Sequence, residues 1–154
     1  MKKLIVTTLV IFIASMAISQ TTDDYVEILR SVLKTEKKAV IAEVMTLTET
    51  EATAFWPLYN EFDAKEFTVQ SKRVKIIKDF VENYDNMTNE KADELWKSYI
   101  SYKQELLNLN MQYYKKFKKI IPAAKAAKYF QAENKIATLV DFQLVSEIPI
   151  IETK

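Results

Sequence analysis

Hydrophobic residues recur along most of this chain with the spacing of amphipathic helices, and not with the alternation of β-strands. Phe55, Phe62, Val69 and Ile76 follow one another at intervals of seven. A second row alternates steps of four and three and consists of Leu95, Tyr99, Tyr102, Leu106, Leu109 and Tyr113. Rows of this kind form the seams along which long helices pack. The pattern predicts an all-α fold built on a long antiparallel helical hairpin.

Four helices are predicted, and the first and last of them flank the hairpin. Pro57 lies inside the second helix, where the missing N–H and the ring are expected to kink the helix or delay its start. The predicted helices cover about residues 23–45, 49–83, 89–120 and 122–148.

One ten-residue phrase occurs twice and begins both helices of the hairpin. It reads LTETEATAFW at 47–56 and MTNEKADELW at 87–96. Thr48 and Thr88 suit the N-cap position, because a Thr hydroxyl can accept from an N–H of the first helical turn. Glu51 stands three residues after Thr48, which predicts a capping box, whereas Lys91 cannot complete one. A weaker copy at 121–130 has Pro122 in place of Thr.

Each phrase ends in a bulky pair, and the only two tryptophans of the chain, Trp56 and Trp96, close the first two copies. We interpret both indole rings as anchors that fix a helix start to the core. On this interpretation, replacing either ring with Ala costs about 3–5 kcal/mol.

Composition argues against most catalytic and cofactor chemistry. The chain contains no Gly, His or Cys, which removes Gly-rich phosphate loops and the commonest metal ligands and proton carriers. Carboxylates remain, and a buried Glu66–Arg73 pair is a conceivable catalytic site; we expect each residue instead to pair across helices or to reach solvent. We predict no catalytic, cofactor-binding or metal-binding residues, and we predict that the chain is not an enzyme.

The N-terminus has the pattern of a cleavable signal peptide at 1–19, with two lysines, an apolar run and then small residues. The apolar run is short for a membrane span. We therefore expect export to the periplasm, a single domain at 20–154 and no stable membrane span after cleavage. Acidic and basic residues nearly balance, so no nucleic-acid partner is expected.

The layout resembles the Spy/CpxP family, periplasmic helical proteins with two LTxxQ motifs, and in particular a Bacteroidetes-type branch often labelled as sensors of extracytoplasmic-function sigma factors. The motif positions here are Leu47, Thr48 and Glu51, then Met87, Thr88 and Lys91, so Glu and Lys replace Gln. The resemblance implies a curved antiparallel homodimer and an envelope-stress chaperone that holds unfolded clients without ATP. The alternative that it implies is a signalling accessory that binds a sensor kinase or an anti-sigma factor. A structural role in the envelope is a third possibility.

The segment between Leu106 and Ala132 has no acidic residue but many lysines and aromatic residues. Its lysines can complement the dipole at a helix C-terminus, or face Glu49 and Glu51 across the hairpin, or form a basic surface for client proteins. The candidate client-binding residues are Tyr113, Tyr114, Lys115, Lys116, Phe117, Lys118, Lys119, Lys125, Lys128, Tyr129 and Phe130.

The chain ends in an apolar segment, Ile148 to Ile151, after the last predicted helix. Such a segment can dock on the helices or on a second subunit, or it can remain free as a partner motif. We expect docking.

Overall fold

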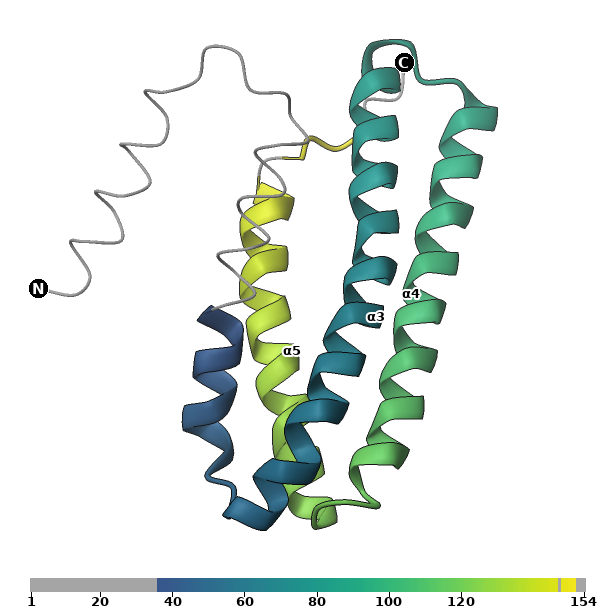
Figure 1. Ribbon diagram of the computed structural model, residues 1–154. Helices are drawn as coiled ribbons and strands as arrows, with labels where there is room; N and C mark the ends of the chain where they lie inside the picture. The colour runs from purple at the N-terminus through teal and green to yellow at the C-terminus, as the bar shows by residue number, and fades with distance from the viewer. Residues whose placement is uncertain (1–35, 147, 152–154) are drawn as a thin grey trace, which may run out of the picture. The chain divides into compact units, whose positions relative to one another are not determined.

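The computed structural model describes residues 36–146 and 148–151, and within them every regular element is a helix (Figure 1). Residues 36–45 are helical, and the following elements are α3 (Glu49–Asn83), the short 3₁₀ helix η1 (Tyr84–Asn86), α4 (Asn89–Phe117) and α5 (Ala123–Ser146). The all-α prediction is confirmed. The predicted signal segment and residues 23–35 of the first predicted helix lie outside the described residues.

The chain divides into two compact units, residues 1–40 and 41–154. The described part of the first unit, residues 36–40, is helical. The second unit contains α3, α4 and α5 together with the core described below.

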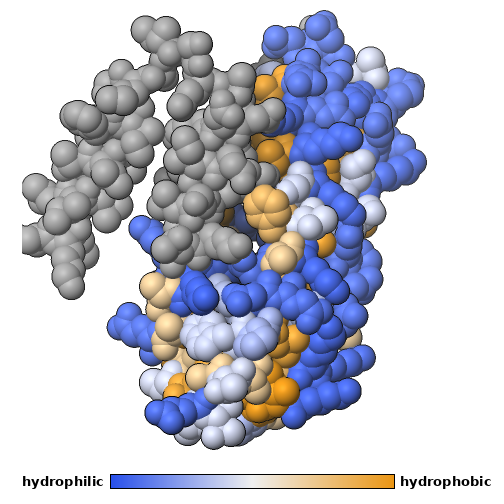
Figure 2. All heavy atoms as spheres, viewed as in Figure 1, coloured by the Kyte–Doolittle hydropathy of each residue, from blue (hydrophilic) through white to orange (hydrophobic). Residues whose placement is uncertain are grey.

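α3 and α4 form the predicted antiparallel hairpin and lie side by side along their length (Figure 1). The predicted seams face inward: Phe55, Phe62, Val69, Tyr102 and Tyr113 are all buried. Polar pairs join the same two helices, with Lys72 Nζ 2.5 Å from Glu105 Oε2 and the Tyr102 hydroxyl donating to Gln70 Oε1 at 2.9 Å. In the face shown by Figure 2, the surface over these helices is mainly hydrophilic, with hydrophobic residues in patches between them.

The three copies of the repeated phrase begin their helices with the same backbone hydrogen bond. The N–H groups of Ala52, Ala92 and Ala126 donate to the carbonyls of Thr48, Thr88 and Pro122, respectively, at 2.8–3.0 Å. Both threonines are N-caps as predicted. Pro122 takes the equivalent place, one residue before the helix, whereas we had predicted it as the first helical residue.

Only the first copy has the reciprocal capping box. Thr48 Oγ1 accepts from the Glu51 N–H at 3.3 Å, and Glu51 Oε2 accepts from the Thr48 N–H at 2.9 Å. At the second start, Thr88 Oγ1 accepts from the Lys91 N–H at 3.1 Å, and the Lys91 side chain reaches Asp79 of α3 instead. This difference agrees with the sequence, because Lys cannot accept the return hydrogen bond.

Of the two effects predicted for Pro57, a kink or a delayed start, the delay does not occur, because α3 begins at Glu49 and continues through the proline. Proline in a helix interior removes one N–H donor and crowds the preceding turn. The capping box and the aromatic contacts that follow it stabilise this first segment of α3. The connection between residue 45 and α3 is a tight turn. Thr46 takes a left-handed conformation there, with φ of 43°, which glycine would adopt more readily, but the chain has no glycine.

α5 completes the second unit by covering one side of the hairpin at its α4–α5 end. Aromatic side chains fill the space between the three helices: Phe117 and Tyr129 have ring centroids 4.7 Å apart, and Phe55 lies 5.1 Å from Phe117 and 5.2 Å from Tyr129. Ile41 and Met45 close the same core. Farther along α5, Asp141 pairs with the buried Arg73 of α3, so Arg73 does pair across helices as expected.

The C-terminal segment returns to the η1 end of the hairpin. The Tyr84 hydroxyl donates to the Ile150 carbonyl at 3.1 Å, which docks the backbone as we expected. The side chains are less enclosed, because Ile150 is 89% exposed.

Candidate protein-binding surface

The predicted client-binding segment divides into a buried aromatic half and an exposed basic half. Tyr113, Phe117 and Tyr129 have no exposed surface. Tyr114 and Phe130 are half-buried against each other, with ring centroids 5.9 Å apart. The prediction that these five rings form a client surface is corrected here, because three of them belong to the core and two pack at its edge. Helical spacing turns their side chains inward, toward α3.

Two of the predicted lysines are part of the structure that holds the helices together. Lys125 Nζ lies 2.5 Å from Glu51 Oε2, which links the start of α5 to the capping box of α3. Lys116 Nζ lies 2.9 Å from Glu61 Oε1, which also accepts from the Tyr113 hydroxyl at 2.6 Å. The interpretation that lysines face Glu51 across the hairpin is therefore right for Lys125, whereas Lys116 meets Glu61.

These contacts change the acidity of both glutamates. The pKa of Glu61 is lowered to about 2, chiefly by the hydrogen bond from Tyr113 and next by the one from Lys116. The pKa of Glu51 is also lowered, first by Lys125 and then by the Thr48 N–H. Both carboxyl groups consequently carry their charge at neutral pH, as ion-pair partners and hydrogen-bond acceptors of the fold.

The other predicted lysines are available to a partner. Lys115, Lys118, Lys119 and Lys128 are exposed, and none has an acidic partner among the residues that the structure describes. Lys118 Nζ lies over the Tyr114 ring, 4.9 Å from its centroid. These four side chains give the α4–α5 end of the molecule an uncompensated positive charge.

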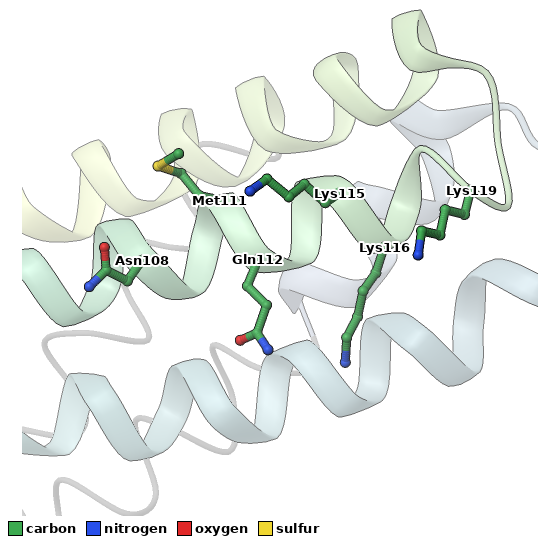
Figure 3. A pocket seen from close by; sticks show the side chains of 6 residues that line it. All are labelled: Asn108, Met111, Gln112, Lys115, Lys116 and Lys119. Atoms are coloured by element: carbon green, nitrogen blue, oxygen red, sulfur yellow. The ribbon is translucent and has the colours of Figure 1, made fainter.

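Two of these lysines border a shallow hollow of about 440 Å³ on α4, lined by Asn108, Met111, Gln112, Lys115, Lys116 and Lys119 (Figure 3). Gln112 and Lys116 point toward α3, and Met111 points away from it (Figure 3). The hollow therefore joins the basic end of α4 to the exposed apolar side chain of Met111.

Met111 belongs to a row of exposed apolar side chains on α4 that was not predicted from the sequence. The row consists of Trp96 (62% exposed), Ile100 (48%), Leu107 (53%) and Met111 (53%). We call these four residues the α4 stripe. Steps of four, seven and four keep them on one helical face within about 60°, outside the seam that packs on α3.

The sequence did carry a signal for the stripe, because α4 has a second apolar row beside the row that was predicted to pack on α3. The prediction that Trp96 anchors the core was wrong: its ring is exposed and stacks on Tyr99, with centroids 5.8 Å apart. The residue before it, Leu95, is the buried anchor. Trp56 is half-buried and packs against the core, 5.1 Å from Phe55, so its prediction as an anchor agrees with its position.

Metal and membrane sites are not visible in the described ranges. Those ranges hold no group of three or more acidic, His or Cys side chains placed to bind a metal ion. Nor does any helix within residues 36–146 have the length and apolar character needed to cross a membrane.

Comparisons with protein-family models, with curated proteins and with solved structures find no match to this chain. The relation to the Spy/CpxP family stays a prediction that depends on the two helix-start motifs and the layout.

Proposed function

We propose that this chain is exported to the periplasm and holds exposed apolar segments of other proteins without using a nucleotide, as an envelope-stress chaperone of the holdase kind. The observation that carries the proposal is the α4 stripe together with the unpaired lysines that follow it at the C-terminal end of α4 and in the turn after it. Contiguous exposed apolar side chains bordered by polar groups are typical of protein-binding sites.

The two parts of this surface have different tasks. Lys115, Lys118 and Lys119 speed the encounter with acidic segments, and salt weakens this contribution because charges are screened over about 10 Å at about 0.1 M. The α4 stripe then holds apolar side chains of the client, which is an interaction that salt does not weaken. The buried rings that we first expected to do this serve the core instead.

A second candidate is a signalling accessory that binds one defined partner, such as a sensor kinase or an anti-sigma factor. The observation that favours it is the regular spacing of the α4 stripe. Large apolar side chains recurring on one helical face are the anchors with which an amphipathic helix occupies a partner groove. A promiscuous client site does not require such regularity.

Aggregation assays separate the two candidates. The protein without residues 1–19 is mixed with two unrelated, chemically denatured clients, and light scattering is followed without nucleotide. We expect suppression near a one-to-one ratio. If a several-fold excess suppresses neither client, the chaperone proposal fails and the signalling proposal gains.

Lysine variants test the basic part with a matched control. Lys115→Gln, Lys118→Gln and Lys119→Gln together should slow client capture several-fold and leave the melting temperature unchanged, because these side chains have no ion pair to lose. Lys116→Gln with Lys125→Gln should lower the melting temperature and leave capture by the folded protein nearly unchanged. The reverse pattern would assign the exposed lysines to stability and contradict the proposed surface.

Variants of the α4 stripe test the apolar part. Leu107→Ser with Met111→Ser should raise the rate at which bound client is released. Leu139→Ser is the control, since Leu139 is an equally large side chain, 71% exposed, on α5. If the control weakens capture as much as the stripe variant does, the binding site is not on α4.

A further inference from the structure

The α4 stripe runs directly into a pair of cations. Leu107, Met111, Lys115 and Lys119 follow one another at intervals of four residues, and all four side chains are exposed. Side chains four residues apart are neighbours on a helix surface. Lys119 stands in the turn after α4, and it lines the same hollow as Lys115 and Met111. A segment that lies along this row therefore meets two apolar side chains and then two ammonium groups.

The hollow on α4 offers the groups that recognise a carboxylate. Lys115 and Lys119 border it, and neither has an acidic partner among the residues that the structure describes. Asn108 Oδ1 accepts from Gln104 Nε2 at 3.0 Å, which leaves the NH2 group of Asn108 as a donor. The Lys115 side chain extends toward Met111, so a positive charge lies next to an apolar side chain (Figure 3). A carboxylate held here is attracted by two cations and can accept from an amide.

The third lysine of the hollow, Lys116, belongs to the fold. Its Nζ lies 2.9 Å from Glu61 Oε1, which also accepts from the Tyr113 hydroxyl at 2.6 Å. The charge of Glu61 is thus compensated within the chain and opposes an incoming carboxylate only weakly. The hollow keeps the positive charge of its two unpaired lysines.

The opposite end of the stripe, beside Trp96, has the reverse character. Lys97 Nζ lies 2.5 Å from Asp93 Oδ2, so this ammonium group is already paired. Lys91 Nζ likewise lies 3.3 Å from Glu94 Oε2. An acidic group of a client gains no unpaired cation from these lysines, and the neighbouring carboxylates repel it. The charges along α4 therefore give the surface a direction.

We propose that this surface selects client segments in which an apolar stretch has acidic residues on one side, and that it binds them in one direction. The acidic residues lie at the hollow, and the apolar residues follow the α4 stripe toward Trp96. The surface is that of the proposed function, on which this assignment of client chemistry rests. In an extended segment every second residue faces the row, because alternate residues are about 6–7 Å apart and residues four apart on a helix rise by about 6 Å.

Three peptides test the selection. They share one apolar segment of alternating Leu and Ser and differ only in the three residues that follow it, which are all Glu, all Gln or all Lys. At low salt the Glu peptide should bind about three- to thirty-fold more tightly than the Gln peptide, the range expected from two exposed ion pairs. The Lys peptide should bind most weakly. In about 1 M salt, which screens charges over about 3 Å, the three Kd values should converge. Equal Kd values at low salt would overturn the selection and leave the proposed function standing.

Paired variants locate the preference. Lys115→Gln with Lys119→Gln should abolish the preference for the Glu peptide and leave the Kd of the Gln peptide unchanged. Lys75→Gln with Lys135→Gln is the matched control. It removes the same charge from exposed lysines of α3 and α5, which have no acidic partner in the described part of the chain. If the control abolishes the preference equally, net charge and not the hollow attracts the acidic residues, and the proposal is wrong.

Trp96 reports the direction of binding. In a Trp56→Phe background, a nitroxide at the end of the Glu peptide away from its Glu residues should quench Trp96 strongly, and a nitroxide at the Glu end should quench it little. Equal quenching from both ends would show binding in both directions and would contradict the proposal. If denatured clients are held but no peptide binds, the client chemistry is wrong and the proposed function stands. If neither peptides nor denatured clients bind, the proposed function fails as well.

Discussion

The two tryptophan-ended segments, 47–56 and 87–96, begin alike and end in opposite environments. In the first, Phe55 is fully buried among rings from α4 and α5, and Trp56 packs against that cluster. In the second, Leu95 is 7% exposed against α3, and the neighbouring Trp96 is 62% exposed. The same local phrase thus produces a core anchor in one place and a surface ring in the other.

The difference arises from the number of neighbouring helices and not from the phrase itself. α5 starts beside the Thr48 end, where Lys125 pairs with Glu51 and Tyr129 packs on Phe55. Contacts at the Thr88 end run between α3 and α4, as in the Lys91–Asp79 pair. The constant element of the phrase is the buried residue just before the tryptophan position, which is Phe55, Leu95 or Tyr129 in the three copies.

The largest expected loss of stability, and the clearest difference between the two segments, comes from replacing their buried residues, Phe55 and Leu95. Phe55→Ala should lower the free energy of unfolding by about 3–5 kcal/mol, and Leu95→Ala should lower it by about 2–3 kcal/mol. Phe55 loses contacts with two neighbouring helices, α4 and α5, whereas Leu95 lies at the end of the hairpin where α3 is the neighbour. Urea unfolding followed by circular dichroism measures both. Equal losses would mean that the Thr88 end is as fully enclosed as the Thr48 end.

Replacement of the two tryptophans should also destabilise the protein unequally, with the larger loss at Trp56. Trp56→Ala should cost about 2 kcal/mol, and Trp96→Ala should cost less than about 1 kcal/mol, because an exposed ring loses little packing. In a Trp56→Phe background, the emission of Trp96 should be that of a water-exposed indole in dilute solution. Losses of 3–5 kcal/mol for both rings would restore the sequence-based interpretation.

The two N-cap threonines should differ less in their contributions to the free energy of unfolding. Thr48→Ala breaks one side of a reciprocal box and should cost about 1–2 kcal/mol, and Thr88→Ala should cost about 0.5–1 kcal/mol. Thr68→Ala is the control, since Thr68 is exposed in the interior of α3 and Ala is the better helix former. A larger loss at Thr88 than at Thr48 would contradict the assigned roles.

The smallest expected effect concerns pH and belongs to the α4–α5 end. The pKa of Glu61 is lowered from 4.5 to about 2 in the folded chain. Its contribution to stability is therefore present above pH 4.5 and disappears as the pH falls toward 2. Wild-type stability should decline over this interval more steeply than that of Glu61→Gln, measured by urea unfolding at several pH values. Parallel pH profiles would show that Tyr113 and Lys116 do not stabilise the Glu61 carboxylate.

The bounds of the helices and their inner seams were predictable because they depend on short-range chemistry. A Thr hydroxyl caps the turn that follows it, and Glu51 can complete a box where Lys91 cannot. The end of α4 was the less certain bound, since α4 stops at Phe117 and not at 120, within a run of lysines that could continue the helix.

The candidate site was predicted only in part. The sequence located the basic end of α4, but it could not tell that Lys116 and Lys125 are paired while Lys115 and Lys119 are not. Ion pairs between helices depend on the rotation and offset of one helix against another. Those quantities come from side-chain packing and leave no local mark in the chain.

By itself, the sequence determined that this protein is helical, where α3 and α4 begin, and that Phe55, Phe62 and Val69 share one buried seam. Tertiary structure alone decided that Phe117 and Tyr129 face inward and that Trp96, Ile100, Leu107 and Met111 face outward. The physical reason is that helical periodicity specifies which residues share a face, whereas burial requires a neighbour. α4 carries two apolar faces, and within the described structure α3 and α5 cover one of them.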